Sequence, residues 1–327
     1  MESRRLKVLN IAGSGRSGST LLHNILGQID GFCAVGELRY VWERGFIKNR
    51  LCGCGVPFRE CDVWRTVARE AFGGMDQVEA PEMLRLTESF RMHHLPLALL
   101  PHIRRRQASR LQGYLEHLER LYRAIQLTTG SRVIVDSSKN PAYGYVLRMI
   151  PVIELYVVHL VRDSRATAYS WSKKKLFQLD TTHPEYMAKK NSISSSLQWD
   201  ARNIATEVYL KHKTKRYLML SYQEMIADPQ RCVTRVLNLL GEPATSLPFV
   251  SRNVAELEAS HSVFGNLVRF QTGRVELSED NEWQTKMKLP DKVVVTALTW
   301  PLLLRYRHLL RPKQPKADDP LASDTDG

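Results

Sequence analysis

The segment Gly13-Ser14-Gly15-Arg16-Ser17-Gly18-Ser19-Thr20 has the composition of a loop that holds a phosphate group. An apolar run, Lys7–Ile11, precedes it, and a helical pattern of apolar residues, Thr20–Gly27, follows it. A glycine-rich turn between a strand and a helix directs backbone N–H groups and the positive end of the helix at an anion. The sequence therefore favours an anion site here over an ordinary glycine-rich turn without a ligand.

This loop lacks the lysine that a nucleoside triphosphatase needs. The Walker pattern G-x-x-x-x-G-K-[ST] places a lysine on the β- and γ-phosphates and a hydroxyl on Mg²⁺. Here Ser19 stands at the lysine position, and the cation, Arg16, lies inside the loop. We therefore expect the loop to hold a 5′-phosphate well and a triphosphate with Mg²⁺ poorly.

A second anion-binding pattern begins at Arg162, directly after the apolar run Glu154–Val161. A helix is expected to begin near Asp163, which is a good N-cap residue. Arg162 should then lie at the carboxyl end of a strand, where open α/β sheets bind ligands. Ser170 follows about two helical turns later, on a face that it could share with the start of the helix. Taken alone, the pattern also fits a capped helix with exposed arginines.

The elements that must position these residues alternate between strands and helices. Strand-like runs occur at Lys7–Ile11, Arg132–Val135, Glu154–Val161 and Tyr217–Ser221. Helical patterns occur at Thr20–Gly27, Asp62–Phe72, Pro81–His94, Gln112–Ile125, Ala142–Ile150, Ser164–Lys174, Ser194–Lys211, Pro229–Leu240 and Lys292–Leu310. This alternation predicts an α/β fold with a parallel sheet and helices on both of its faces.

Residues 76–130 are almost wholly helical in pattern, so we expect a helical insertion within one domain that spans residues 1–311. Residues 312–327 shift to Pro, Lys, Asp and Ser, which is typical of a disordered tail. The 327 residues, 43% of them hydrophobic, can bury a sizeable core. Neither a bilayer-spanning stretch nor the apolar core of a signal peptide is evident, so a soluble, cytoplasmic protein is expected.

The net charge of +13 indicates anionic partners, such as nucleotide phosphates or acidic substrates. Because the chain shows no zinc-finger spacing, no RNP-type aromatic motif and no repeats, nucleic acid is not a predicted partner. Of the five cysteines, Cys52, Cys54 and Cys61 are clustered, without an obvious fourth ligand beside them. We therefore predict no metal site, and a redox-labile cysteine pair stays open.

Together, the two anion patterns and their spacing resemble the sulfotransferases that use 3′-phosphoadenosine 5′-phosphosulfate (PAPS). In that family a loop of the form (P/S)-R-S-G-[ST]-[ST]-L follows the first strand and binds the 5′-phosphosulfate. A second motif, L-[VI]-R-[DN]-x-R-x-x-x-x-S, supplies an arginine and a serine to the ribose 3′-phosphate. Arg16-Ser17-Gly18-Ser19-Thr20 match the first motif, and Arg162 and Ser170 match the second.

The resemblance implies a P-loop-like, three-layer α/β/α fold with a central parallel sheet. It also implies PAPS as co-substrate, adenosine 3′,5′-bisphosphate as product, and no metal. It explains the missing lysine, because PAPS has no γ-phosphate to hold.

Three weaker similarities extend the resemblance to about residue 290. Asp136-Ser137-Ser138-Lys139-Asn140-Pro141 is similar to a loop whose lysine contacts the sulfuryl group or the bridging oxygen. The segment from Tyr222 to Gly241 is similar to a Y-E-D-L…D-P…L-G segment, with the tyrosine near the nucleotide. His261–Phe270 resembles a C-terminal segment that closes over the 3′-phosphate, which implies this role for Arg269 or Arg274.

Sulfuryl transfer needs a base for the proton of the acceptor. Related tyrosyl-protein and carbohydrate sulfotransferases place a catalytic glutamate after a G-E signature, which implies that Glu37 is the general base. His102 is the positional rival, and an ordinary surface glutamate is the alternative for Glu37. Arg16 and Lys139 are then expected to stabilise the transferring group.

The acceptor, which could be a small molecule, carbohydrate, lipid or peptide with a hydroxyl or amine, and the oligomeric state stay open. A P-loop kinase or NTPase and a non-catalytic nucleotide-binding protein are the alternative functions.

Overall fold

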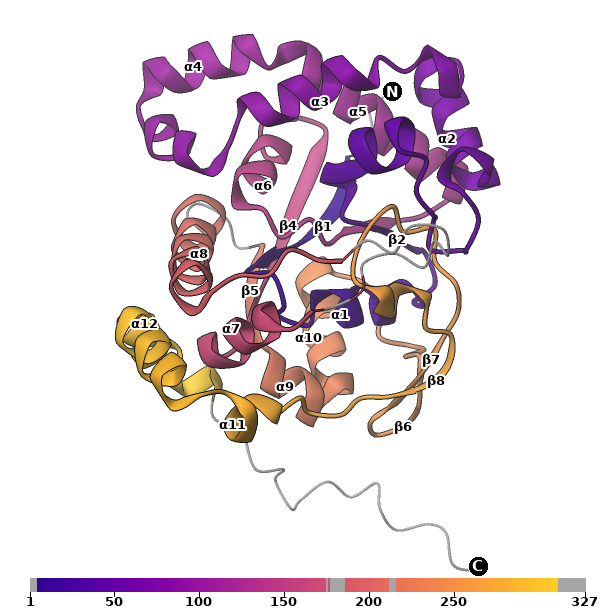
Figure 1. Ribbon diagram of the computed structural model, residues 1–327. Coiled ribbons are helices and arrows are strands. Elements are labelled where there is room, and N and C mark those ends of the chain that lie inside the picture. The colour runs from indigo at the N-terminus through magenta and orange to yellow at the C-terminus, as the bar shows by residue number, and fades with distance from the viewer. Residues whose placement is uncertain (1–4, 175, 177–185, 212–215, 311–327) are drawn as a thin grey trace, which may run out of the picture.

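A parallel sheet forms the centre of the fold in the computed structural model, which describes residues 5–174, 176, 186–211 and 216–310 (Figure 1). Its five strands lie in the order β2-β3-β1-β4-β5. They are β1 (Leu6–Gly13), β2 (Phe32–Gly36), β3 (Val133–Asp136), β4 (Ile153–Val161) and β5 (Tyr217–Ser221). Because β1 lies between β3 and β4, the loop after β1 emerges at a topological switch point, where α/β sheets bind ligands.

Helices cover both faces of this sheet, as the alternation of the sequence predicts. Val8 of β1 packs into one apolar cluster, whereas Leu9 and Ile11 pack into another, so the strand is buried on both sides. One face carries α5 (Gln112–Thr129) and α6 (Pro141–Leu147), and the other carries α1 (Ser19–Leu26) and α10 (Pro229–Leu240). The predicted three-layer α/β/α fold is confirmed.

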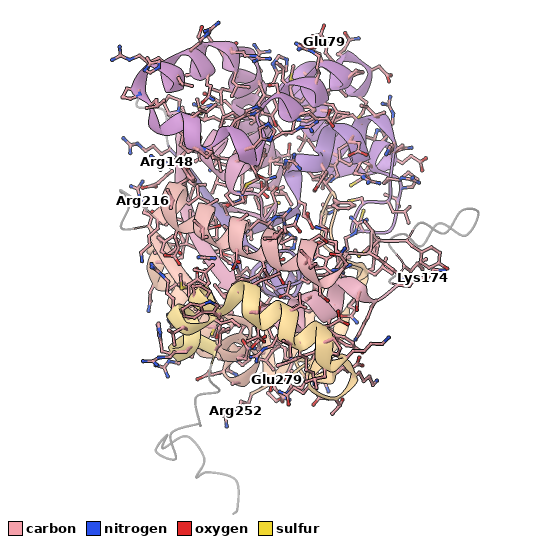
Figure 2. The ribbon with its side chains drawn as sticks, turned by 60° about the vertical axis from the view of Figure 1, so that its left-hand side comes forward. Glu79, Arg148, Lys174, Arg216, Arg252 and Glu279 are labelled. Carbon is pink, nitrogen blue, oxygen red and sulfur yellow. The ribbon has the colours of Figure 1, made fainter. Side chains whose placement is uncertain are left out.

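The remaining helices extend these two layers. They are α2 (Asp62–Phe72), α3 (Ala80–Ser89), α4 (Pro101–Arg110), α7 (Ser164–Ser172), α8 (Ser192–Ala205), α9 (Tyr222–Ala227), α11 (Glu282–Lys286) and α12 (Leu289–Leu310). Helices α8 and α12 lie side by side in Figure 2 and share a buried cluster of Val161, Trp199 and Tyr306. Among the described helices, none combines the length and apolarity needed to cross a membrane.

Four strands are additions to the predicted elements. The edge strand β2 is only five residues long and has no alternating pattern. The other three, β6 (Phe249–Ser251), β7 (Val254–Leu257) and β8 (Gly273–Glu276), form a small antiparallel sheet. Residues 76–130 are helical as predicted, and the predicted tail, residues 312–327, lies outside the described residues.

Candidate active site

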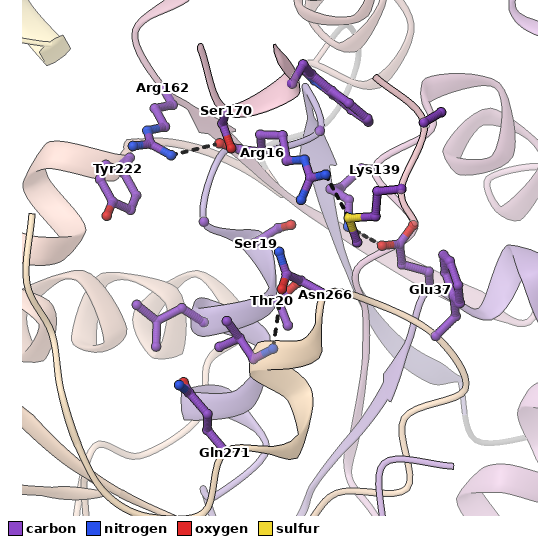
Figure 3. A pocket seen from close by; sticks show the side chains of 18 of the residues that line it. Arg16, Ser19, Thr20, Glu37, Lys139, Arg162, Ser170, Tyr222, Asn266 and Gln271 are labelled. Atoms are coloured by element: carbon purple, nitrogen blue, oxygen red, sulfur yellow. Dashed lines mark hydrogen bonds and ion pairs between the residues drawn. The ribbon is translucent and has the colours of Figure 1, made fainter. Parts of the chain in front are cut away.

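A cavity of about 700 Å³ opens at the carboxyl ends of the central strands. Each of four strands delivers a predicted group: β1 the glycine-rich loop, β2 Glu37, β3 Lys139 and β4 Arg162. The predicted residues that line the cavity are Gly15, Arg16, Gly18, Ser19, Thr20, Glu37, Lys139, Arg162, Ser170 and Tyr222. Figure 3 shows their arrangement, with Arg162 and Ser170 on one side of the loop and Glu37 and Lys139 on the other.

The glycine-rich loop has a backbone that its sequence makes possible. Gly18 has φ 88°, and a Cβ atom there would lie 2.6 Å from the Tyr222 ring, so a side chain is excluded on two grounds. Arg16 has φ 69°, which is uncommon for a residue with a side chain and is frequent at functional sites. Helix α1 begins at Ser19, so its first N–H groups face the cavity end of the loop.

The Arg16 side chain crosses the mouth of the cavity. Its guanidinium lies 4.7 Å from the centre of the Trp171 ring, and Nη2 donates to Sδ of Met187 at 2.7 Å. Burial lowers the pKa of Arg16, whereas the nearby charge of Glu37 raises it. A cation held in a partly dry site is suited to binding an anion, because few water molecules compete for it.

Three buried polar atoms of the two anion patterns test whether an anion fits. Within the described residues, Nε of Arg16, Oγ of Ser17 and Nε of Arg162 have no hydrogen-bond partner. Each such atom costs about 1–3 kcal/mol when it is left unsatisfied. Phosphate oxygens would supply the missing acceptors, so the donor set fits a nucleotide with more than one phosphate group.

Arg162 is held at the end of β4 by four contacts. Its Nη1 donates to the carbonyl of Arg16 at 3.3 Å, and its Nη2 donates to the carbonyl of Asp280 at 3.0 Å. Nη2 also lies 3.2 Å from Oδ2 of Asp280, and the guanidinium lies 4.3 Å from the centre of the Tyr222 ring. The predicted N-cap is confirmed, since the Asp163 side chain accepts from the N–H of Arg165. The capped helix carries the buried Ser170 to the same cavity wall.

Glu37 and Lys139 form an ion pair inside the cavity. Nζ of Lys139 donates to Oε1 of Glu37 at 2.7 Å and to the carbonyl of Ser137 at 3.0 Å. Both side chains are mostly buried, at 12% and 9% exposed respectively. Lys139 also has a left-handed backbone, φ 56°, which turns its side chain back toward the cavity. Glu37 is therefore not a free surface glutamate.

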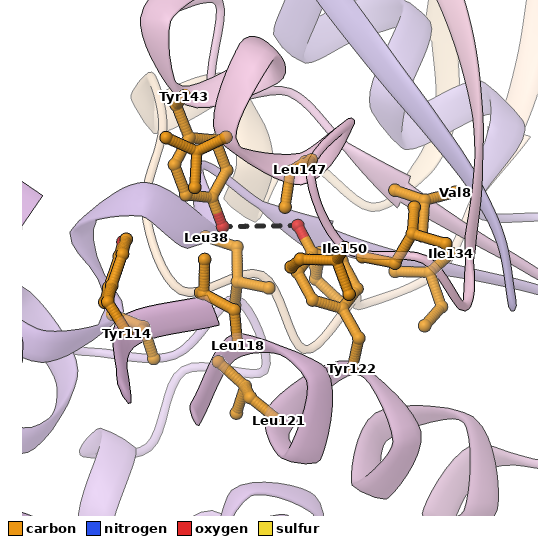
Figure 4. Packing of buried hydrophobic residues seen from close by; sticks show 14 of the residues in the cluster. Val8, Leu38, Tyr114, Leu118, Leu121, Tyr122, Ile134, Tyr143, Leu147 and Ile150 are labelled. Atoms are coloured by element: carbon orange, nitrogen blue, oxygen red, sulfur yellow. Dashed lines mark hydrogen bonds between the residues drawn. The ribbon is translucent and has the colours of Figure 1, made fainter. Parts of the chain in front are cut away.

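Asp136 fixes the loop that carries Lys139. Its Oδ1 accepts from the N–H and the hydroxyl of Ser138, and its Oδ2 accepts from the hydroxyl of Tyr122 at 2.6 Å. Tyr122 belongs to α5 and also contacts the hydroxyl of Tyr143 within the packed core (Figure 4). Burial raises the pKa of Asp136 to about 6, although the hydrogen bonds from Ser138 and Tyr122 lower it. The helical layer thus anchors the lysine loop.

His23 of α1 fixes the approach to Glu37. Its Nε2 accepts from the N–H of Gly36 at 2.7 Å, so this nitrogen carries no proton. The N–H of Glu37 itself donates to the carbonyl of Phe264 at 3.0 Å. Burial lowers the pKa of His23 from 6.5 to about 4. The neutral imidazole is therefore part of the folded structure.

This burial predicts how acid affects stability. The stabilisation from neutral His23 is fully present above pH 6.5 and is lost as the pH falls toward 4, because only unfolded His23 takes up the proton. Between pH 7 and pH 5 the wild type should lose about 2 kcal/mol of unfolding free energy relative to His23→Gln. Urea unfolding of both proteins at the two pH values measures this difference. Equal losses in the two proteins would contradict the role of His23.

Some predicted residues lie outside the cavity. The guanidinium of Arg269 donates to the carbonyls of Ser262 and Leu51, at 2.9 and 2.8 Å, because the short helix that carries it, Leu267–Phe270, faces the loop before α2. Arg274 is exposed and pairs with Glu256. Ser17 is completely buried beneath the loop. The rival base, His102, lies on the exposed helix α4, so the structure does not bring it to Lys139.

The cavity also contains residues that the sequence did not reveal. They include Tyr40, Arg44, Trp171, Arg202, Phe264 and Asn266. Burial lowers the pKa of Arg202, which α8 places on this wall. These side chains come from segments without a recognisable motif, so only the fold could bring them together. The wall that they form is cationic and aromatic.

Comparisons with known proteins agree with this geometry. The sequence model of the sulfotransferase family matches residues 9–246, although no curated protein sequence matches the chain. The structure is similar to the sulfotransferase domain from the curacin biosynthetic pathway, with 15% identity, 92% of this chain and 98% of that chain covered, and a TM-score of 0.50. It also matches the sulfotransferase domain of the Synechococcus PCC 7002 olefin synthase, at 16% identity, 92% and 96% coverage, and a TM-score of 0.48. The family match covers well over half of the sequence, so the chain belongs to the sulfotransferase family.

Proposed function

We propose that this protein transfers the sulfuryl group of PAPS to a hydroxyl or amine of an acceptor. The observation that carries the proposal is one cavity with cationic groups at two places and a carboxylate–ammonium pair beside them. The loop around Arg16 would bind the 5′-phosphosulfate, and Arg162 with Ser170 would bind the 3′-phosphate. Tyr222, whose ring lies against Arg162, would contact the nucleotide between these groups.

The reaction follows from the order of these groups around the cavity. The acceptor oxygen or nitrogen attacks sulfur in line with the bridging oxygen, so one bond to sulfur forms as the S–O bond to the phosphate breaks. Glu37 accepts the proton of the acceptor, and adenosine 3′,5′-bisphosphate leaves. Lys139, Arg16 and the N–H groups at the start of α1 stabilise the negative charge on the transferring group and the leaving phosphate.

The structure supports this reading over a P-loop kinase or NTPase. Ser19 occupies the lysine position at the start of α1, so no ammonium reaches β- and γ-phosphates from there. The carboxylate at the end of β3, Asp136, has both oxygens engaged by Ser138 and Tyr122. A carboxylate so engaged is poorly suited to the Mg²⁺ role of a Walker B aspartate.

Transfer of label from [³⁵S]PAPS tests the proposed activity. Sugars, phenols, lipids and peptides would be incubated separately with the full chain and [³⁵S]PAPS, with Glu37→Gln as the inactive control. We expect the wild type to label at least one acceptor class and the variant to label none above background. If PAPS binds but its label stays on the nucleotide with every class, the protein is a nucleotide-binding module rather than a transferase.

A further inference from the structure

Three cysteines and one histidine meet at a site that the proposed reaction does not use. Cys52, Cys54 and Cys61 belong to the loop before α2, and His261 follows Cys61 by 200 residues. Their three Sγ atoms and one ring nitrogen of His261 all lie within 4.8 Å of one another. The sequence offers no fourth ligand beside the cysteines, and the fold supplies one from a distant segment.

The distances among these atoms suit one tetrahedral metal ion. Sγ of Cys54 lies 3.8 Å from Sγ of Cys61. Nδ1 of His261 lies 3.3 Å from Sγ of Cys61 and 4.0 Å from Sγ of Cys52. A zinc ion with Zn–S bonds of about 2.3 Å and a Zn–N bond of about 2.0 Å has edges of roughly 3.8 Å between sulfurs and 3.6 Å between sulfur and nitrogen. The four ligand atoms already lie close to these edges.

The backbone around the cluster is fitted for a close approach of the two segments. A Cβ atom on Gly53 would lie 2.5 Å from the carbonyl oxygen of Ser260, so only glycine fits between the cysteines. The N–H of Gly53 donates to the carbonyl of Ser262 at 2.9 Å. Nε1 of Trp64 donates to the carbonyl of His261, also at 2.9 Å. These bonds hold the histidine against the cysteine loop independently of its ring.

The charge next to the cluster also suits a bound metal ion. Three thiolates and one divalent cation carry a net charge of −1, which is costly to bury without a partner. Arg269 is buried beside the cluster, binds the carbonyls of Leu51 and Ser262, and interacts electrostatically with Cys52 and Cys54. Arg269, which the resemblance implied for a phosphate, thus supplies the compensating positive charge here.

We propose that Cys52, Cys54, Cys61 and His261 bind a structural zinc ion. Four protein ligands close the coordination shell, which is the arrangement of structural rather than catalytic zinc. The ion would fasten the cysteine loop to the segment after His261. That segment supplies Phe264 and Asn266 to the cavity, and its Phe264 carbonyl accepts from the N–H of Glu37. The zinc site is independent of the identity of the donor nucleotide.

Metal analysis of the purified full chain tests this proposal. Protein produced in zinc-supplemented medium without chelators should contain one zinc per chain. Cys61→Ser should lose it, because three ligands cannot close the site. Cys33→Ser is the matched control, since Cys33 is a free cysteine of β2 outside the cluster, and it should keep the full zinc content.

A second measurement uses the wild type alone, in case Cys61→Ser does not fold. Wild type with cobalt in place of zinc should show thiolate-to-cobalt charge transfer and the visible bands of tetrahedral Co²⁺. Chelation of the ion should lower the melting temperature of wild type and leave that of any soluble Cys61→Ser unchanged. A wild type that binds neither zinc nor cobalt, or a Cys54–Cys61 disulfide in the fresh protein, would overturn the proposal.

Discussion

Replacing Glu37 with glutamine is expected to lower the turnover of sulfuryl transfer by about 10²- to 10⁴-fold, the usual effect of losing a general base. The substitution removes the proton acceptor but keeps an amide oxygen that can still accept from Nζ of Lys139. The melting temperature and the affinity for adenosine 3′,5′-bisphosphate should therefore change little. Single-turnover transfer of ³⁵S to the acceptor found in the screen measures the effect.

Glu43→Gln is the matched control for this experiment. Glu43 lies six positions after Glu37, pairs with Lys48 and does not line the cavity, so its variant should retain wild-type turnover. Wild-type turnover in Glu37→Gln would show that another group takes the proton. A loss that is equally large in both variants would indicate a general structural effect instead of catalysis by Glu37.

Replacing Arg162 with alanine is expected to weaken the binding of adenosine 3′,5′-bisphosphate by about 2–4 kcal/mol, or roughly 30- to 1000-fold in Kd. The buried guanidinium is fixed by Arg16, Asp280 and Tyr222, so its charge is preorganised for a phosphate. Adenosine 5′-monophosphate lacks the 3′-phosphate and should lose much less affinity. Calorimetry with both nucleotides measures the two losses.

The neighbouring Arg165 provides the control. Its guanidinium pairs with Asp163 and lies over Trp283, outside the cavity, so Arg165→Ala should bind both nucleotides as the wild type does. Equal losses for the two nucleotides in Arg162→Ala would contradict a contact with the 3′-phosphate. They would indicate instead that Arg162 supports the loop through its bond to the Arg16 carbonyl.

The elements that could be predicted are those whose signals are local. Strand β4 follows from a long apolar run, and helix α2 follows from a pattern that begins and ends where the structure has it. The glycine-rich loop could be recognised because its glycines meet a steric requirement, as Gly18 shows against Tyr222. Lys139 could be placed because it follows the end of a strand, and strand ends gather at one edge of a parallel sheet.

The rest depends on contacts between distant segments. Strand β2 gains its place by pairing with β3, and its five residues have no alternation of their own. Arg269 carries no sequence signal for the loop it binds, since Leu51 lies 218 residues earlier. His261 is equally remote from the cysteines that it joins. Patterns along the chain report periodicity and turns, whereas these contacts depend on the tertiary fold.

The donor nucleotide is the centre of the proposed function, and calorimetry on the full chain tests it most directly. Adenosine 3′,5′-bisphosphate is predicted to bind with one site per chain, and ATP with Mg²⁺ is predicted to bind far more weakly. Arg162→Ala should abolish this preference, whereas Arg165→Ala should keep it. Binding of ATP with Mg²⁺ alone, without measurable binding of adenosine 3′,5′-bisphosphate, would contradict the assignment of the cavity to PAPS.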